Sequence, residues 1–359
     1  MKIVIIGAGL AGLTAAATLQ AAGARVEVIE ASGRVGGRIR TLRDPESDAT
    51  LGDLGPTWVW PPHQPVAARW LDHLGLTTFE QFNRGDAVIL GYGPEPMRQP
   101  LPGQDGMARI VGGPGAMIDA LGDRVGAGAI RTSTVVTEVV QGEGGLIAVH
   151  LASGDVTIAH QVIVATPLRV AARTLNLPWA PHSLMDAMRN TPTWMAPQAK
   201  AVAVYERPFW RDAGLSGRIA SRIGPLMEAH DHCGLHDSPA AIFGFVGWPP
   251  EQRRRDPDGL RRAIVDQLSR SFGPAAETPL WLGVQDWASD PLITTDLDLA
   301  HPALHPEVGP AVLRQSYLGG RVRFAVSEAS DISPGLIEGA LAIGEQAARA
   351  CLAWPAERR

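Results

Sequence analysis

The chain has 359 residues, of which 45% are hydrophobic and 19% are charged, and this apolar content excludes an intrinsically disordered protein. A formal net charge of −5 argues against a general nucleic-acid binder and against a protein held on a membrane by a basic patch. Two cysteines are too few for a disulfide framework, and no apolar run has the length that a bilayer requires, so we expect a cytoplasmic protein.

The first 30 residues predict a strand, a glycine-rich turn, a helix and a second parallel strand. Residues 2–6 have the pattern of a buried strand, residues 14–22 that of a helix of small side chains, and residues 25–30 that of a strand ending in an acid. A signal peptide would also begin with a lysine and an apolar stretch. The glycines directly after residue 6 favour the strand–turn–helix unit instead.

The turn in this unit has the pattern of a dinucleotide-binding site, G-x-G-x-x-G. Gly7 permits the tight turn, Gly9 lets the backbone approach a pyrophosphate, and Gly12 allows close packing of helix on strand. The start of the helix offers free N–H groups to the phosphates. Glu30 can accept hydrogen bonds from both ribose hydroxyls of an adenosine. Both NAD and FAD use this unit, so the unit alone does not choose between them.

The next stretch carries two arginines and a pair of glycines directly after the acidic residue. Arg34 and Arg38 can pair with phosphate oxygens, and Gly36 and Gly37 let the chain pass close to a cofactor; solvated surface charge is the alternative for both arginines. Here the sequence begins to resemble the flavin-dependent amine oxidase family, whose N-terminal signature runs through such an E-x₃-R-x-G-G-R segment. The resemblance implies that the cofactor is FAD.

Three further segments extend the resemblance over nearly the whole chain. In relatives, the loop corresponding to residues 53–63 lies along the flavin ring. The strands expected at residues 130–140, 146–151 and 156–165 resemble a second flavin-contacting segment, in which Val136 would meet the adenine; core packing explains Val136 equally well. The end of the chain resembles the C-terminal flavin motif, in which Glu328 would bind the ribityl–phosphate arm.

The resemblance implies an α/β fold, namely a Rossmann-like FAD-binding domain of the GR2 flavoprotein type with an inserted α+β substrate domain. The FAD-binding domain is expected to be discontinuous, with residues 1–75, 106–182 and 288–355. The substrate domain is expected to comprise residues 76–105 and 183–287. The residues expected to contact FAD are Gly7, Gly9, Leu10, Ala11, Gly12, Glu30, Ala31, Arg34, Gly36, Gly37, Arg38, Gly55, Pro56, Thr57, Trp58, Val136, Glu328, Leu336 and Ile337.

Lys200 is the residue that we expect to be catalytic. The chain has 30 arginines and only two lysines, Lys2 and Lys200. Lys200 falls on the lysine of the family motif K-x₄-Y-x₂-P-F-W, and in relatives this ammonium holds a water beside flavin N5. A buried lysine is a flexible point charge with a pKa that burial can lower, which arginine cannot imitate. A lysine without a role on a strand face is the alternative.

The sequence departs from the family at the substrate site. Well-known relatives hold the amine between two aromatic side chains, whereas the corresponding positions here are Leu336 and residues 296–298, without an aromatic. Trp60, His63 and Trp287 are expected to line the substrate cavity, although core packing explains the tryptophans about as well. The roof segment of relatives is shortened, which predicts a more open cavity or one completed by a second subunit in a homodimer.

The cysteines and histidines predict neither a covalent flavin nor a metal site. Cys233 and Cys351 lie away from the segment that carries the flavin-linking cysteine in some relatives, so we expect noncovalent FAD. His230 and His232 beside Cys233 form an H-x-H-C cluster. No second ligand pair at zinc-like spacing accompanies this cluster, so we predict no metal.

The resemblance therefore implies an oxidase of the C–N bond of a primary or secondary amine, with a small-molecule amine and O₂ as its partners. A hydride equivalent would pass to flavin N5, water would hydrolyse the imine, and O₂ would be reduced to H₂O₂. Two alternatives stay open: a renalase-like oxidase of dihydronicotinamides, and a flavin-binding protein without catalytic activity that acts through a partner. Neither a nucleic acid nor a membrane is expected as a partner.

Overall fold

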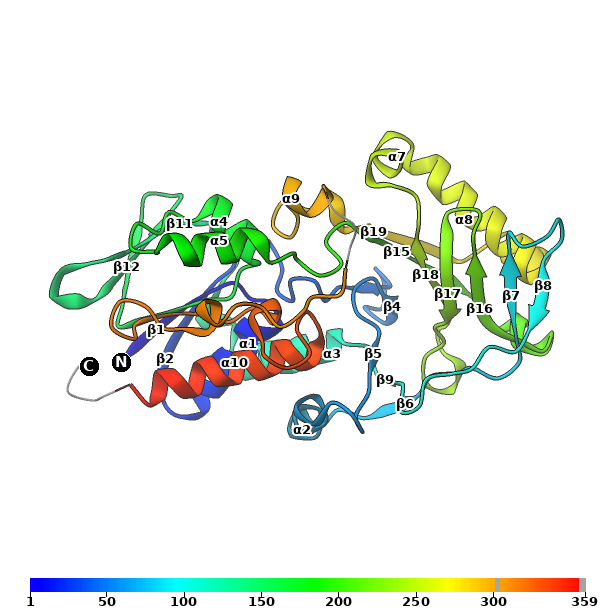
Figure 1. Cartoon of the computed structure of the whole chain (residues 1–359). Coiled ribbons are helices and arrows are strands. Elements are labelled where there is room, and N and C mark those ends of the chain that lie inside the picture. The colour runs from blue at the N-terminus through cyan, green and yellow to red at the C-terminus, as the bar shows by residue number, and fades with distance from the viewer. Residues whose placement is uncertain (301–303, 355–359) are drawn as a thin grey trace.

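A computed structural model describes residues 1–300 and 304–354, and its two lobes are seen in Figure 1. One lobe is built on a five-stranded parallel sheet, and the other on a seven-stranded mixed sheet. The five-stranded sheet has the order β10 (Ile130–Arg131), β2 (Arg25–Ile29), β1 (Lys2–Ile6), β14 (Gln161–Val164) and β20 (Val322–Phe324). The expected strand at residues 2–6 is thus confirmed, at the centre of this sheet.

Both faces of the five-stranded sheet are covered, as a parallel sheet requires. Ile3 and Ile5 point to one face and Val4 and Ile6 to the other, because successive side chains of a strand alternate. The helices on the first face are α1 (Leu10–Ala21), α3 (Gly115–Val125) and α10 (Ile337–Leu352). The second face is covered by β11 (Val136–Gln141), β12 (Ile147–Leu151), β13 (Val156–Ala159), α4 (Leu168–Thr174) and α5 (His182–Asn190).

Two of the expected strands are each divided in the structure. The strand expected at residues 130–140 consists of β10, which joins the five-stranded sheet, and β11, which joins β12 and β13 in a separate sheet. Ser133 between them has a φ of 50°, which turns the chain. The strand expected at residues 156–165 likewise becomes β13 and β14, because the chain passes from one sheet to the other at His160.

The seven-stranded sheet carries the second lobe, with helices on its outer face (Figure 1). Its order is β19 (Trp281–Asp286), β15 (Ala199–Tyr205), β18 (Ala240–Val246), β17 (Leu226–Asp231), β16 (Leu215–Ser221), β7 (Asp86–Leu90) and β8 (Met97–Gln99). Helix α8 (Pro257–Phe272) is capped by Asp256, whose carboxylate accepts from the Gly259 N–H at 2.8 Å. Leu260, Ile264 and Leu268 of α8 follow every fourth residue and pack on this sheet.

The remaining elements are mostly shorter. They are the hairpin of β3 (Thr41–Arg43) and β4 (Thr50–Asp53), the small sheet of β5 (Trp58–Val59), β9 (Ala108–Ile110) and β6 (Thr78–Glu80), and the helices α2 (Pro65–Leu74), α6 (Phe209–Asp212), α7 (Pro250–Arg255) and α9 (Asp296–Leu299). Single 3₁₀ turns lie at Ala127–Ala129, Glu143–Gly145, Leu235–Asp237, Pro274–Ala276, Trp287–Ser289, Ala311–Arg314 and Ser327–Ala329. Among the described residues, no helix is both long enough and apolar enough to cross a bilayer. The domain boundaries remain a prediction, and the last of them, Pro355, lies outside the described residues.

Candidate active site

A cavity of about 420 Å³ lies between the two lobes, and both of the large sheets contribute to its wall. Strands β1 and β2 reach it with their carboxyl ends, where parallel sheets bind ligands. The predicted site residues on its wall are Gly7, Gly9, Leu10, Ala11, Glu30, Ala31, Arg34, Gly36, Gly37, Arg38, Gly55, Pro56, Thr57, Trp58, Trp60, Val136, Lys200, Trp287, Leu336 and Ile337. Gly12, His63 and Glu328 are not part of this wall. His63 is exposed, and its neighbour Gln64 reaches the wall instead.

Of the three motif glycines at the turn between β1 and α1, only Gly9 has open space beside it for a ligand. A Cβ at Gly7, where φ is 108°, would lie 2.8 Å from the carbonyl oxygen of Ala165, and a Cβ at Gly12 would lie 2.0 Å from the carbonyl oxygen of Gly7. These two glycines are required by the packing of the chain on itself. A Cβ at Gly9 would meet no atom within 4 Å, and Gly9 lines the cavity. The space beside Gly9 fits the pyrophosphate of a dinucleotide.

Glu30 lies at the end of β2 with its carboxylate held in a fixed orientation. One oxygen accepts from the Ala8 N–H at 2.7 Å and the other from the Ser32 N–H at 2.8 Å. A carboxylate oxygen has more than one acceptor position, so each can still accept from a ribose hydroxyl. The backbone donors therefore aim the carboxylate without using up its capacity to bind an adenosine.

The two arginines of the glycine-pair segment bind the protein chain itself. Arg34 donates to the carbonyl oxygens of Val35, Gly37 and Ile39, which fixes the loop after β2. Arg38 forms an ion pair of 2.6 Å with Glu328, whose side chain is 2% exposed. Burial alone would raise the pKa of Glu328, but the Arg38 guanidinium holds that pKa below its usual value. Direct contacts of these arginines with phosphates stay a prediction.

Lys200 reaches the cavity because side chains alternate along β15. Ala199, Ala201 and Ala203 pack against the α8 side, so Lys200 points to the opposite face. Lys200 is 3% exposed, and its Nζ donates to the carbonyl oxygen of Gly55 at 2.8 Å and to the hydroxyl of Thr57. The ring centroid of Phe243 lies 4.1 Å from this nitrogen. Burial lowers the pKa of Lys200 to about 7, although the carboxylate of Asp53 acts in the opposite direction.

Buried polar groups lie behind Lys200. The Asp53 N–H donates to Nε2 of His232 at 2.8 Å, so this nitrogen is an acceptor and the ring is neutral. Burial lowers the pKa of His232 to about 3, in agreement with that geometry. His230 has a different partner from His232, because its Nε2 lies 2.6 Å from a carboxylate oxygen of Glu228. In the part of the chain that the structure describes, no group of three or more His, Cys, Asp or Glu side chains has an arrangement that could hold a metal.

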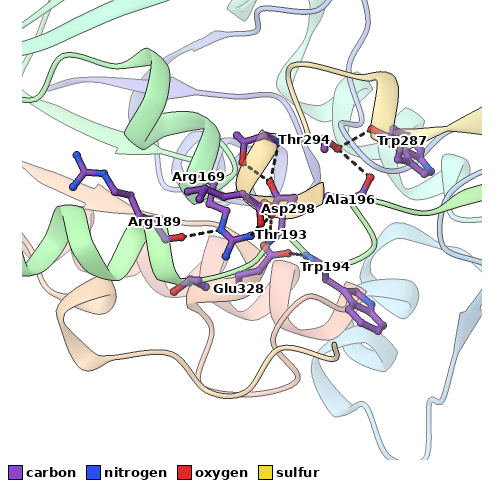
Figure 2. Close-up of polar contacts among 12 residues, drawn as sticks. Arg169, Arg189, Thr193, Trp194, Ala196, Trp287, Thr294, Asp298 and Glu328 are labelled. Atoms are coloured by element: carbon purple, nitrogen blue, oxygen red, sulfur yellow. Dashed lines mark hydrogen bonds and ion pairs between the residues drawn. The ribbon is translucent and has the colours of Figure 1, made fainter. Parts of the chain in front are cut away.

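The positions that correspond to the family's aromatic pair differ in their relation to the cavity. Leu336 lines it, whereas Asp298 is buried outside it in a polar network with Arg169 and the backbone of Thr193 (Figure 2). Asp298 also accepts from Thr295 in the capping box of α9, so its carboxylate stabilises the start of this helix. At residues 296–298, where the resemblance implies the second aromatic position, the structure therefore has a structural carboxylate.

Several wall residues were missed by the sequence reasoning, namely Trp194, Met195, Gln198, Phe245, Asp290 and Ile293. Phe245 stands opposite Lys200 in the β15–β18 register, which only the pairing of these strands reveals. Trp194 lies between two prolines in the segment before β15, and its place on the wall depends on contacts with distant parts of the chain. Cys233 and Cys351 are free and buried, and neither lies on the cavity wall.

Comparisons with known proteins agree with this geometry. The family model for flavin-containing amine oxidoreductases matches residues 10–100 and 96–352. Putrescine oxidase from Kocuria rosea is 24% identical, over 80% of this chain and 82% of that protein. A probable flavin-containing monoamine oxidase A from Dictyostelium discoideum is 24% identical over 66% of this chain, and the chain spans only about half, 51%, of that relative.

Solved structures show the same fold over nearly the full length. A redesigned variant of putrescine oxidase superposes with a TM-score of 0.80 at 21% identity, covering 99% of each chain. Cyclohexylamine oxidase from Brevibacterium oxydans IH-35A superposes with a TM-score of 0.77 at 19% identity, covering 97% of this chain and 98% of the other. The fold class predicted from the sequence is thereby confirmed. The chain belongs to the flavin-containing amine oxidoreductase family, and its cofactor is FAD.

Proposed function

We propose that this chain is an FAD-dependent oxidase of primary or secondary amines. The observation that carries the proposal is the placement of Lys200, a buried ammonium on the cavity wall that is tethered to Gly55 and Thr57. Relatives named putrescine oxidase, monoamine oxidase and cyclohexylamine oxidase support the substrate class.

The protein's part in the reaction is to bind, orient and exclude water. When bound, FAD supplies the acceptor for the hydride equivalent at N5 and delivers the two electrons to O₂, which yields H₂O₂, while water hydrolyses the imine product. The start of α1 and the space at Gly9 would hold the pyrophosphate, and Glu30 the ribose. Glu328, through Arg38, would fix the part of the wall beside the ribityl–phosphate arm.

The cavity wall favours an amine with an apolar body. Trp58 is held by a hydrogen bond from its Nε1 to Gln81 at 2.8 Å, and Trp287 by one from its Nε1 to the Leu54 carbonyl at 3.1 Å. These rings and Leu336 limit the water that reaches the reacting carbon. Lys200, with its pKa near 7, can hold or release a proton at Nζ under ordinary conditions, which suits a step in which charge builds up nearby.

The proposal includes a cytoplasmic setting and noncovalent FAD. Two free, buried cysteines suit a reducing compartment, and neither lies where it could bond to a flavin in the cavity. Heat or acid precipitation should release all of the FAD into the supernatant. A homodimer in which a second copy narrows the cavity mouth is the oligomeric state to test first, by light scattering of the purified holoprotein.

Anaerobic reduction of the bound flavin tests the activity directly. Primary and secondary amines, amino acids and dihydronicotinamides are added one at a time, and the visible absorption of the flavin is followed. Bleaching by an amine, reversed in air with one H₂O₂ formed per turnover, is the expected result. Bleaching by dihydronicotinamides alone would establish the renalase-like activity instead. A flavin that no compound reduces would contradict both assignments.

A further inference from the structure

The segment of residues 193–196 crosses from the lobe of the five-stranded sheet to β15 and forms part of the cavity wall, and we call it the crossover segment. Side chains from other parts of the chain form hydrogen bonds with the backbone of this segment, and Figure 2 shows Asp298, Glu328 and Thr294 among them. Asp298 accepts from the Thr193 N–H at 3.0 Å, and Glu328 accepts from the Trp194 N–H at 3.0 Å. The hydroxyl of Thr294 bonds to the carbonyl oxygen of Ala196 at 3.0 Å.

The carboxylates that hold the crossover segment are themselves buried and paired. Asp298 bonds to Arg169 at 2.8 Å with 1% of its side chain exposed, and Glu328 bonds to Arg38 at 2.6 Å with 2% exposed. Arg38 also donates to the carbonyl oxygen of Trp194 at 3.0 Å. A displacement of the segment would break these hydrogen bonds and leave the N–H groups of Thr193 and Trp194 and the carbonyl of Trp194 without partners, which costs free energy. The segment is therefore a rigid part of the wall.

The Trp194 side chain leaves this polar network and lines the cavity. In Figure 2 its indole points away from the dashed contacts. A Cβ on Gly335 would lie 2.8 Å from the Cβ of Trp194, so the tryptophan stands beside the residue that precedes Leu336. Its ring centroid lies 4.9 Å from that of His305. An aromatic face thus enters the wall next to Leu336, one of the two positions at which the expected aromatic ring is missing.

We propose that Trp194 is a specificity-determining residue that binds the cationic nitrogen of the substrate against the face of its indole. The inference rests on the proposed amine oxidase function and adds the substrate class, an amine that enters the cavity as its cation and carries an apolar body. Asp290, a carboxylate on the same wall, favours a cation in the cavity, and Lys200, Arg34 and Arg38 oppose one. A cation over an indole is the strongest of the cation–aromatic contacts, and its strength increases where water is excluded.

Two probes of equal shape separate the charge effect from simple packing. Choline carries a quaternary nitrogen that has no lone pair and cannot form an imine, and 3,3-dimethyl-1-butanol replaces that nitrogen by carbon. Their dissociation constants are measured on the FAD-loaded protein by the change in visible flavin absorption and by calorimetry. We expect the protein to bind choline more tightly than the alcohol, and Trp194→Leu to weaken choline binding by about 5- to 30-fold with little change for the alcohol.

Two variants complete the design. Trp194→Phe keeps a weaker aromatic face, so its affinity for choline should lie between the affinities of the wild type and of Trp194→Leu. If Trp194→Leu does not retain FAD, the affinity of Trp194→Phe for choline tests the proposal in its place. Trp281→Leu is the matched control, because Trp281 is 40% exposed on β19 and is not on the cavity wall. Its affinity for choline should equal that of the wild type.

The outcomes distinguish this inference from the proposed function. Unchanged choline affinity in the Trp194 variants, or an equal loss for both probes, would overturn the role of Trp194 while leaving the amine oxidase activity intact. A wild-type flavin that no amine reduces would overturn the function, and the choline measurements, which do not depend on turnover, would still report whether Trp194 binds a cation.

Discussion

The ammonium nitrogen of Lys200 lies 2.8 Å from the carbonyl oxygen of Gly55. This contact joins β15 of the seven-stranded sheet to the loop after β4, and both residues lie on the cavity wall. The loop is the segment expected along the flavin ring. The single buried lysine of the chain is thereby held beside the expected position of the reacting part of the cofactor, and Lys2, the other lysine, is a surface residue paired with Glu27.

Replacement of Lys200 by methionine should leave FAD bound but slow the reaction of the reduced flavin with O₂. We expect a loss of about 10²-fold, the scale found when one electrostatic group is removed from an active site. Stopped-flow mixing of the reduced protein with O₂ measures the rate constant. Lys2→Met is the matched control and should react as the wild type does. An unchanged rate constant in Lys200→Met would remove the role assigned to this lysine.

The low pKa of Lys200 should also make stability depend on pH. The folded protein holds this proton with a pKa of about 7, below the ordinary value of 10.5, so the unfolded chain binds more protons between these pH values. The contribution of Lys200 to the free energy of unfolding therefore rises with pH in this window and is most unfavourable below pH 7. Urea unfolding of the apoprotein at pH 7 and pH 9 should show a gain of about 2 kcal/mol that Lys200→Met lacks. Equal pH dependence in the two proteins would contradict the lowered pKa.

Much of this site could be predicted because its elements are local in sequence. The glycine turn, Glu30 and the lysine motif each lie within a short segment, and a period of two along β15 is enough to bring Lys200 to the opposite face from the alanines. Trp194 could not be found in this way. The backbone N–H of Trp194 donates to Glu328, which lies 134 residues away in the sequence. The N–H of the neighbouring Thr193 donates to Asp298, which lies 105 residues away. Contacts between residues so far apart leave no pattern in the sequence around Trp194.

The division of the predicted strand at residues 130–140 has a similar cause. Its residues have the composition of one continuous strand, but the two ends pair with different sheets. Which partner strand each end meets is decided by the packing of β2 and β12, and neither lies within the segment. The sequence pattern indicates that a residue is extended, and the tertiary structure decides with what it pairs.

Two glycine substitutions should separate cofactor binding from folding. Gly9→Ala adds a Cβ that meets no protein atom within 4 Å, so the free energy of unfolding of the apoprotein should change by no more than about 0.5 kcal/mol while FAD affinity falls. Gly12→Ala places its Cβ 2.0 Å from the carbonyl oxygen of Gly7, so it should destabilise the apoprotein by about 1–3 kcal/mol. Urea unfolding and FAD titration measure the two effects. Normal FAD affinity in Gly9→Ala would show that the pyrophosphate does not occupy this space.

Removal of the Asp298 carboxylate should destabilise the protein through its buried partner. Arg169 is 7% exposed and forms its ion pair with Asp298, so Asp298→Ala leaves a buried guanidinium with only the carbonyl oxygens of Arg189 and Leu297. Loss of one member of such a pair costs about 3–5 kcal/mol, and we expect a destabilisation of about 3 kcal/mol because those carbonyl contacts remain.

Asp296→Ala is the matched control for this loss, because Asp296 begins the same short helix but is exposed. Its free energy of unfolding should differ from that of the wild type by less than about 0.5 kcal/mol. Since Asp298 also holds the backbone of Thr193, Asp298→Ala should in addition weaken choline binding at Trp194, and Asp296→Ala should not. A destabilised Asp298→Ala protein that binds choline with unchanged affinity would show that the crossover segment keeps its position without this carboxylate. The remaining contacts at Glu328 and Thr294 would then be sufficient to orient the indole.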